Sequence, residues 1–303
     1  MTEIAVKIDN LTCHFGDVTA LENLSLSVPT GSIYAVVGKN GAGKTTALRT
    51  LMGMIRPTSG RVEILGLDCT TEGEKTRQQV GYLPESRSLY GYMRVAEILR
   101  FAQSFHRDWD DALTRRYLEL FHIPQGRLIS QLSAGMQTQL GLILALAHNP
   151  RVLILDEPIA HLDAVRVKEL LTVILEEALA KEQTVVLSSH ALHQVERVTD
   201  HVAIVDQGRL VVEKPLEDMK VDEKRIRVAF QVDPPGDLFD HPDVVKIERD
   251  GRKYLVTVRG SVDDIIHKCS RIPHFALDVI DMNLEEIFLQ YAQSSEEDHT
   301  HEA

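Results

Sequence analysis

The stretch Gly38-Lys39-Asn40-Gly41-Ala42-Gly43-Lys44-Thr45 decides the fold of this chain. It follows Ser32–Val37, an apolar run that predicts a short buried strand, and it leads into Lys44–Met54, whose pattern predicts a helix. A glycine-rich loop between a strand and a helix lets successive backbone N–H groups point inward at the positive end of the helix. This context is typical of a phosphate-binding loop, so the sequence predicts a nucleotide site here.

Individual residues of the loop have expected roles. Lys44 is expected to reach the β- and γ-phosphates of a nucleotide, and the Thr45 hydroxyl is expected to hold Mg²⁺. The strand and helix on either side favour a nucleotide site over a chance match to the pattern. The predicted nucleotide-binding residues of this stretch are Gly38, Asn40, Gly41, Gly43, Lys44, Thr45 and Thr46.

Length and composition are those of an ordinary globular protein. The chain has 303 residues, of which 44% are hydrophobic and 26% charged, and this suits one large domain and a small one. Cys13, Cys69 and Cys269 lie far apart and form no CxxC pair, so we expect reduced thiols in the cytosol. A formal net charge of -12 and the lack of a Lys/Arg block argue against non-specific binding to DNA or RNA.

No segment of the sequence predicts a membrane span or a targeting peptide. Residues 1–4 have neither the basic start nor the apolar core of a signal peptide. The longest apolar run, Leu142–Ala147, is much shorter than the roughly 20 residues that cross a bilayer. Any role at a membrane is therefore expected to need a partner. The acidic tail, residues 295–303, is predicted to be solvated and disordered rather than a His-rich metal site.

The predicted fold class is α/β, with a P-loop nucleotide-binding domain over residues 1–217. From about Met93 to His148 the hydrophobic period becomes helical, which predicts a helical insertion over about residues 86–148. The α/β pattern then resumes at Val152–Asp156, a continuous apolar run typical of a buried parallel strand. Thr184–Ser189 is predicted to be the next strand.

Residues 218–294 predict a second, smaller α+β domain. Residues 244–258 indicate a hairpin about Asp250-Gly251. Asn283 and Glu286 have the spacing of a capping box at the start of a last helix. This region holds no catalytic constellation, so we interpret it as an accessory domain.

Carboxylates and a histidine follow the predicted parallel strands. Asp156 and Glu157 end the strand that follows the helical insertion, and His190 ends the next strand along the chain. The carboxyl ends of neighbouring parallel strands converge at one crevice. Downstream of a phosphate-binding loop, Asp156 is expected to bind Mg²⁺ and Glu157 to orient or deprotonate the attacking water. A neutral His190 is expected to bond the γ-phosphate and that water.

These residues belong to a set of motifs that resembles the ATPase subunit of an ATP-binding cassette (ABC) transporter. Leu132–Met136 (Leu-Ser-Ala-Gly-Met) resembles the cassette signature, and Gly81–Glu85 resembles the segment that leads into the Q-loop. Residues 160–163 resemble the D-loop, and Phe15 stands where the family places an aromatic ring against adenine. The motifs follow the family order from Phe15 to about Val212.

The resemblance implies an ATPase that binds ATP and Mg²⁺ and works as a homodimer. In the family, the helix N-terminus that bears residues such as Ser133 and Gly135 binds the γ-phosphate across a head-to-tail dimer, so that each ATP is held between two subunits. The resemblance also implies an integral membrane permease subunit that docks near the helical insertion. Nucleic acid is not an implied partner, and the expected location is the cytoplasmic face of the cell membrane.

The C-terminal unit adds a finer expectation. Its end, Asn283–Leu289, is similar to the extension of exporter-type ATPases, which work with separate membrane subunits. Such relatives are often linked to the export of drugs, antibiotics, ions or polysaccharides. The resemblance therefore favours an exporter.

Glu85 departs from the family pattern, in which many relatives have Gln. A carboxylate only accepts hydrogen bonds, and it is attracted to Mg²⁺. Glu85 is therefore expected to act through the metal, together with Thr45 and Asp156. The alternative is that Glu85 is a solvated loop residue.

Three further positions depart from the family pattern. Ala134 and Met136 replace the first Gly and the Gln of the signature, and His161 replaces a smaller D-loop residue. Because Glu157 and His190 are both present, an active enzyme is still expected.

Two other functions remain open at the level of sequence. One is a soluble ABC-type ATPase that acts on the ribosome or on nucleic acid, although such relatives carry two cassettes, coiled coils or zinc cysteines. The other is a nucleotide-binding regulatory subunit, which would lack a catalytic residue, whereas none is missing here.

Overall fold

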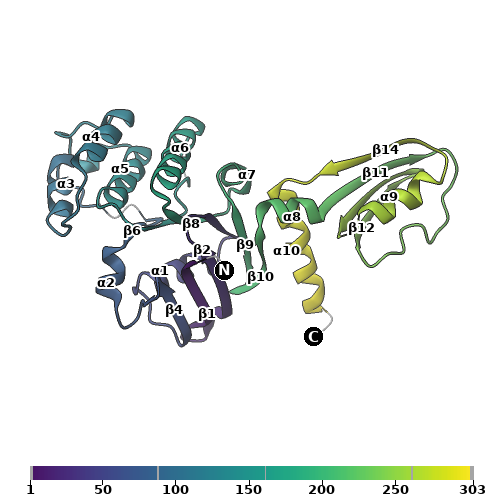
Figure 1. The fold of residues 1–303 in the computed structure, drawn as a ribbon, viewed down its shortest axis with the longest axis horizontal. Coiled ribbons are helices and arrows are strands. Elements are labelled where there is room, and N and C mark those ends of the chain that lie inside the picture. The colour runs from purple at the N-terminus through teal and green to yellow at the C-terminus, as the bar shows by residue number, and fades with distance from the viewer. Residues whose placement is uncertain (1–2, 87–88, 161, 261, 301–303) are drawn as a thin grey trace. The chain divides into compact units, whose positions relative to one another are not determined.

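Two sheets and helix α1 (Lys44–Leu51) build the first unit of the chain, Met1–Glu213 (Figure 1). The computed structural model describes residues 3–86, 89–160, 162–260 and 262–300, with side chains up to residue 292. One sheet has the strand order β2-β1-β4-β5, and the other has the order β10-β9-β3-β8-β7-β6. The strands of the first sheet are β1 (Ile4–Phe15), β2 (Val18–Pro29), β4 (Ser59–Ile64) and β5 (Leu67–Asp68). Those of the second are β3 (Ile33–Val37), β6 (Val80–Leu83), β7 (Val152–Asp156), β8 (Thr184–Ser189), β9 (His201–Asp206) and β10 (Arg209–Pro215).

The second sheet is parallel where the candidate site lies. β3 pairs in parallel with β8 and with β9, β8 pairs with β7, and β7 pairs with β6. All residues of β3, β7 and β8 are buried, which is consistent with the apolar runs that make up most of these strands. The carboxyl ends of these three strands therefore meet at one edge of the sheet.

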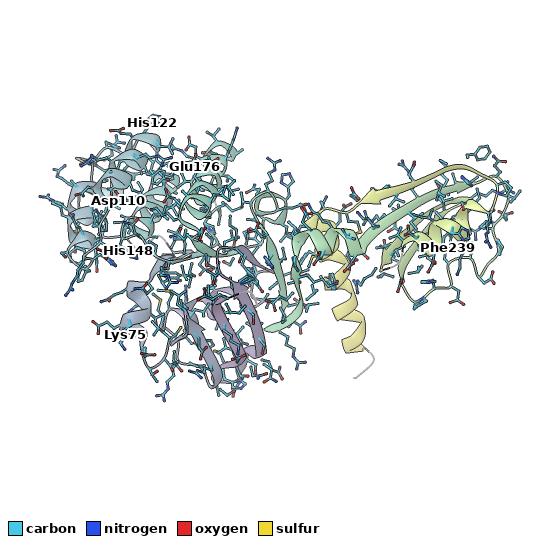
Figure 2. The ribbon with its side chains drawn as sticks, in the orientation of Figure 1. Lys75, Asp110, His122, His148, Glu176 and Phe239 are labelled. Carbon is cyan, nitrogen blue, oxygen red and sulfur yellow. The ribbon has the colours of Figure 1, made fainter. Side chains whose placement is uncertain are left out.

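The first unit also contains helices α2 to α7. Asp110, labelled in Figure 2, caps helix α4 by accepting a hydrogen bond from the Leu113 backbone N–H at 2.8 Å. Helices α3, α4 and α5 lie within the region predicted as a helical insertion, and α6 follows β7. The helices are α2 (Gly73–Gln78), α3 (Val95–Gln103), α4 (Asp111–Leu120), α5 (Ala134–Leu146), α6 (Ala164–Lys181) and α7 (Leu192–Val195), with a short 3₁₀ turn at Ile129–Gln131.

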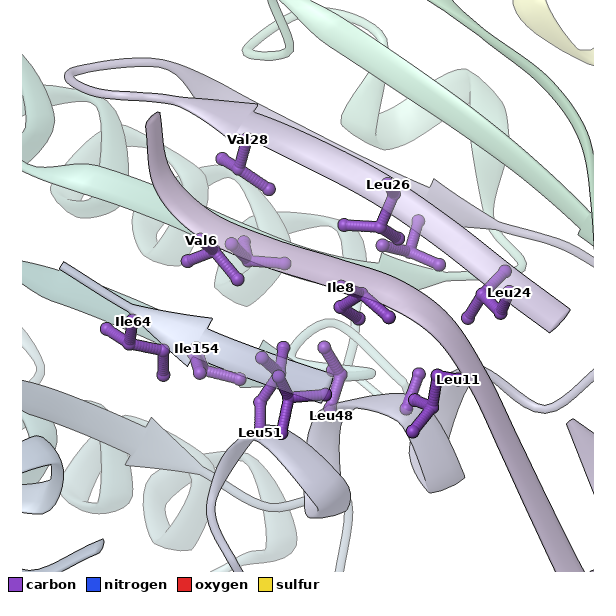
Figure 3. Close-up of a cluster of buried hydrophobic side chains, with 14 of the residues drawn as sticks. Val6, Ile8, Leu11, Leu24, Leu26, Val28, Leu48, Leu51, Ile64 and Ile154 are labelled. Atoms are coloured by element: carbon purple, nitrogen blue, oxygen red, sulfur yellow. The ribbon is translucent and has the colours of Figure 1, made fainter. Parts of the chain in front are cut away.

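A core cluster of buried apolar side chains fixes α1 against the strands (Figure 3). Leu48 and Leu51 of α1 are about 1% exposed and pack in one cluster with side chains of both sheets. Each buried leucine contributes roughly 1.5–3 kcal/mol relative to exposure. The N-terminus of α1 is thereby held at the carboxyl end of β3. Other members of the cluster are Val6, Ile8, Leu11, Leu24, Leu26, Val28, Ile64 and Ile154.

The second unit, Lys214–Ala303, has its own sheet and its own core. The strand order is β12-β13-β11-β14, and Ile226, Val228 and Val256 are among its fully buried core residues. The predicted hairpin joins β12 to β13, and the predicted capping box is confirmed. Asn283 Oδ1 accepts from the Glu286 N–H at 2.9 Å, and Glu286 Oε2 accepts from the Asn283 N–H at 3.0 Å. The elements are α8 (Leu216–Asp222), β11 (Glu223–Phe230), β12 (Val244–Asp250), β13 (Lys253–Arg259), α9 (Val262–Ser270), β14 (His274–Asp281) and α10 (Leu284–Thr300).

Several boundaries differ from those expected. The chain divides after Glu213, whereas the sequence placed the boundary after residue 217. Helix α10 continues to Thr300, so the backbone of residues 295–300 is helical here rather than disordered. No Gly or Pro occurs after the cap at Asn283, and nothing in the local sequence therefore stops the helix. Residues 301–303 of the predicted tail lie outside the described residues.

Two histidine rings stack near the ends of α3 and α5. The ring centroids of His106 and His148 are 4.0 Å apart, and His148 Nε2 lies 3.2 Å from the Val80 carbonyl oxygen. Burial, assisted by the charge that His106 would carry, lowers the pKa of His148 to about 4. Burial also lowers the pKa of His106. Between about pH 4 and pH 6.5 His148 therefore binds more protons in the unfolded chain than in the folded chain.

We expect the free energy of unfolding to be insensitive to His148 above about pH 6.5 and to fall as the pH drops toward 4. The loss from this residue should be on the order of 3 kcal/mol. Urea unfolding across this range measures it. His148→Gln, whose amide can still donate to the Val80 carbonyl, should flatten the dependence, and the exposed His193→Gln should leave it unchanged. Equal pH dependence for His148→Gln and the parent chain would contradict the assignment.

Candidate active site

The phosphate-binding loop joins β3 to α1, and close backbone approaches require two of its glycines. A Cβ atom on Gly38 would lie 2.3 Å from the carbonyl oxygen of Val205 in β9. A Cβ atom on Gly43 would lie 2.6 Å from Leu21 Cδ2, and Gly43 has a φ of 102°, in the left-handed region. The loop can follow this path only with glycine at both positions.

The loop and the first turn of α1 line a cavity of about 380 Å³. The N-cap of α1 is Gly43, which has no side chain that could cap the helix, and the first turn contains no acidic residue. The first backbone N–H groups and the positive end of the helix are therefore left for an anion. Of the predicted loop residues, Gly38 alone does not line the cavity. The lining residues are Ala20, Asn40, Gly41, Ala42, Gly43, Lys44, Thr45, Thr46, Glu85 and Glu157.

Lys44 brings a buried positive charge to this cavity. Its Nζ donates hydrogen bonds to the carbonyl oxygens of Gly38 at 2.8 Å and Lys39 at 3.2 Å. The same atom lies 3.5 Å from Glu157 Oε1. A buried ammonium needs acceptors and a negative partner. Glu157 is one such partner, and the oxygens of a phosphate in the cavity would be another.

Asp156 ends β7 and is fully buried. Its Oδ1 accepts hydrogen bonds from Thr45 Oγ1 at 2.9 Å and from Ser188 Oγ at 2.8 Å. Its Oδ2 is buried and has no hydrogen-bond partner among the described residues. Such an orphaned carboxylate oxygen is unfavourable unless a cation or a donor reaches it. Its place beside the Thr45 hydroxyl fits Mg²⁺, which takes few protein ligands and adds water and phosphate oxygens.

Glu157 connects Lys44 to His190. Its Oε2 lies 2.9 Å from His190 Nδ1 and also accepts a longer hydrogen bond, 3.4 Å, from the His190 backbone N–H. The Glu157 side chain is buried, whereas half of the His190 side chain is exposed. When Nδ1 of a neutral His190 donates to this carboxylate, Nε2 keeps a lone pair that can accept a hydrogen bond. The structure therefore brings the two predicted catalytic residues together.

Ser188 is a site residue that reasoning from the sequence missed. Its hydroxyl donates to Asp156 Oδ1 at 2.8 Å and accepts from the Glu157 backbone N–H at 2.9 Å. Ser188 is fully buried and is paired with Asp156 across β8 and β7. The signal in the sequence was two serines at the end of an otherwise apolar strand, next to His190.

Two further predicted site residues, Glu85 and Phe15, are exposed. Glu85 lines the cavity together with Glu157, and both also line a second cavity of about 120 Å³ toward α5. Phe15 lies at the end of β1, opposite Val18 of β2, and is 49% exposed. It does not line the phosphate-loop cavity. An exposed ring of this kind is available to stack on a nucleotide base.

Comparison with known proteins identifies the family. The ABC transporter family model matches residues 21–160. The chain is 34% identical over 231 residues to the bacitracin transport ATP-binding protein BcrA of Bacillus licheniformis, covering 75% of this chain and 74% of that protein. The chain belongs to the ATP-binding subunits of ABC transporters.

Solved ABC cassettes share the fold of this subunit. An ATP-binding subunit of an ABC transporter superposes with a TM-score of 0.66 at 28% identity, covering 72% of this chain and 92% of that one. A dimeric bacterial ABC transporter cassette gives a TM-score of 0.64 at 20% identity, covering 70% of this chain and 98% of that one. The predicted P-loop α/β fold is confirmed. No helix in the described part of the chain is long and apolar enough to cross a membrane.

The residues that resemble the ABC signature do not line the phosphate-loop cavity of their own chain. Ser133 is exposed and is the N-cap of α5, where its Oγ accepts a hydrogen bond from the Met136 N–H at 3.2 Å. Gly135 lies in the first turn of the same helix. Neither residue is among those that line the cavity. Another position that departs from the family pattern, His161, lies outside the described residues.

Replacing Ser188 tests whether its hydroxyl positions Asp156 and Glu157. We expect Ser188→Ala to lower the turnover of ATP by about 10-fold or more, because the Glu157 N–H loses its acceptor and Asp156 loses one donor. ATP affinity measured without Mg²⁺ should change by less than about twofold, since Ser188 does not line the cavity. Steady-state kinetics and nucleotide titration separate these effects.

The matched control is Thr172→Ala, which removes an exposed hydroxyl that donates to the Lys168 carbonyl on α6. It should alter neither quantity. Turnover of Ser188→Ala at the level of the parent chain would show that Asp156 and Glu157 need no help from β8.

Proposed function

We propose that this ABC subunit hydrolyses ATP and couples the reaction to separate integral membrane subunits. The observation that carries the proposal is the Glu157 carboxylate, which connects Lys44 Nζ to His190 Nδ1 beside the phosphate-loop cavity. A carboxylate in this position can take a proton from water, while a buried ammonium neutralises charge on phosphate oxygens.

Each side chain has a distinct part in the proposed hydrolysis. Glu157 would orient and deprotonate the attacking water. His190 would hold this carboxylate through Nδ1–H and accept a hydrogen bond from the same water at Nε2. A hydrogen bond from Nε2 to a phosphate would require the protonated ring. Lys44 and the N-terminus of α1 would hold the phosphates.

Mg²⁺ is the proposed metal cofactor. Thr45 Oγ1 and Asp156 would hold it, directly or through water, with Glu85 as a further candidate ligand. Bound there, the ion would neutralise charge on the phosphates. The orphaned Asp156 Oδ2 supports this site.

A homodimer with head-to-tail ATP sites completes the proposal. Ser133 and Gly135 do not line the cavity of their own chain, and Ser133 is exposed at a helix N-terminus. This position suits the phosphate of a nucleotide that is bound to a second chain. The description of a solved cassette of the same fold as dimeric is consistent with this assembly.

The membrane partner and the direction of transport follow from the resemblance of the motifs. We propose that a permease subunit docks near the helical insertion, residues 86–148, and keeps the subunit at the cytoplasmic face of the membrane. The similarity of the C-terminal unit to exporter extensions supports export, and the bacitracin transport named for a relative supports a transport function without giving its direction. The matched family and relative are transporter subunits, which supports this function over one on the ribosome or nucleic acid.

Glu157→Gln tests the base directly. The amide keeps the shape of the side chain but cannot take the proton, so hydrolysis should fall by about 10²-fold or more while ATP still binds. An ATP-bound dimer should then accumulate, which light scattering coupled to gel filtration would detect. Lys44→Ala should instead abolish ATP binding in an equilibrium titration. Turnover of Glu157→Gln near that of the parent chain would refute Glu157 as the base.

Glu85→Gln tests the proposed metal contact. Removing the negative charge should weaken the Mg²⁺ dependence of hydrolysis and leave Mg²⁺-free nucleotide affinity equal or better, because the charge repels phosphate. Magnesium titrations of ATPase activity measure this. Glu74→Gln, on helix α2 and not among the residues that line the cavity, serves as the control and should have no effect. Superimposable titration curves for Glu85→Gln and the parent would leave Glu85 without a metal role.

A further inference from the structure

Arg166, near the start of α6, contacts two helices of the insertion. One guanidinium nitrogen, Nη1, donates to Gln139 Oε1 on α5 at 2.6 Å and to the carbonyl oxygen of Phe121, at the end of α4, at 3.3 Å. Glu169, one turn further along α6, accepts from Gln139 Nε2 at 2.9 Å. Gln139 is fully buried, and both the oxygen and the nitrogen of its amide are hydrogen-bonded to residues of α6. Arg166 therefore joins α6 to the helix that carries the signature.

The stem of Arg166 lies beneath the signature itself. A Cβ atom placed on Gly135 would be 3.3 Å from Leu162 Cδ2 and 3.8 Å from Arg166 Cγ. Gly135 and Gln139 are four residues apart, and therefore on one face of α5. The backbone N–H of Arg166 donates to Asp163 Oδ1, the N-cap of α6, at 3.0 Å. Arg166 is thus hydrogen-bonded to the cap of α6 and to the next turn of the signature helix, and its stem lies next to the signature glycine.

Other contacts between α6 and the insertion lie farther from the signature. Glu176, labelled on α6 in Figure 2, pairs with Arg116 of α4 at 2.7 Å, and Glu177 accepts a hydrogen bond from Tyr117. The Arg116–Glu176 pair is largely exposed. This pair also joins α6 to the helical insertion through an arginine, and its partners do not include the signature helix, so it provides a control contact.

We propose that Arg166 is a positioning residue for the signature. It fixes the N-terminus of α5, with Ser133 and Gly135, relative to the D-loop, and so sets how well this surface can bind the nucleotide of a second chain. The inference rests on the proposed ATP-dependent homodimer. Arg166 touches no residue that lines the phosphate-loop cavity among its described contacts. Loss of the Arg166 guanidinium should therefore leave ATP binding by the single chain unchanged.

Arg166→Met in the full-length Glu157→Gln chain tests the proposal, because Met keeps the stem beneath Gly135 and removes only the guanidinium. The concentration of chain needed for half-maximal ATP-dependent dimerisation, measured by analytical ultracentrifugation, should rise about 10-fold or more. ATP affinity measured at chain concentrations below dimerisation should stay within about twofold. Hydrogen exchange should quicken at residues 134–139 and remain unchanged at residues 44–51.

Arg116→Met is the matched control and should change neither dimerisation nor exchange at residues 134–139. Unchanged dimerisation and exchange in Arg166→Met would overturn the proposal, and so would a loss of ATP affinity, which would show a general effect on folding. If the Glu157→Gln parent itself does not dimerise with ATP, the proposed homodimer fails. Hydrogen exchange then decides alone whether Arg166 positions α5: faster exchange supports it, and unchanged exchange overturns it.

Discussion

The hydrogen-bond register between β3, β7 and β8 is the constraint on which the active site depends. It sets Val37 opposite Ser189 and Asp156 opposite Ser188, so three strand ends finish level with one another. A slip of one residue would turn each of these side chains to the other face of the sheet. The core cluster around α1 opposes such a slip, because it buries residues of both sheets against one short helix. Stability of the core and geometry of the site are therefore set by the same contacts.

Much of the fold and part of the site could be predicted from the sequence because their signals are local. The loop from Gly38 to Thr45 and the carboxylates after β7 are recognisable from spacing and from the apolar runs before them. The prediction that Asp156 and His190 converge followed from parallel strand order alone. For residues 295–300 the sequence predicted a disordered tail, whereas the described backbone continues as a helix with a good cap and no breaker.

Other site residues could not be predicted because their roles depend on pairing across the fold. Ser188 becomes important only when β8 lies beside β7 in one particular register. Arg166 belongs to a helix whose sequence predicts an amphipathic surface, and nothing near it indicates Gln139 or Phe121 as its partners. The signature residues were recognisable by resemblance, yet only the structure shows that Ser133 is exposed and does not line its own chain's cavity.

The backbone of Glu157 has a φ of 49°, in the left-handed region that glycine and asparagine adopt more readily than glutamate. This conformation turns the chain sharply after β7, and it costs of order 1 kcal/mol or more for a residue with a long side chain. The backbone conformation at position 157 therefore favours glycine or asparagine, whereas the proposed reaction needs the carboxylate of glutamate. Selection or design for thermal stability alone would tend to replace this glutamate and lose the carboxylate that faces Lys44. If Glu157 is the proposed base, retaining it keeps the reacting carboxylate at the expense of a more relaxed backbone.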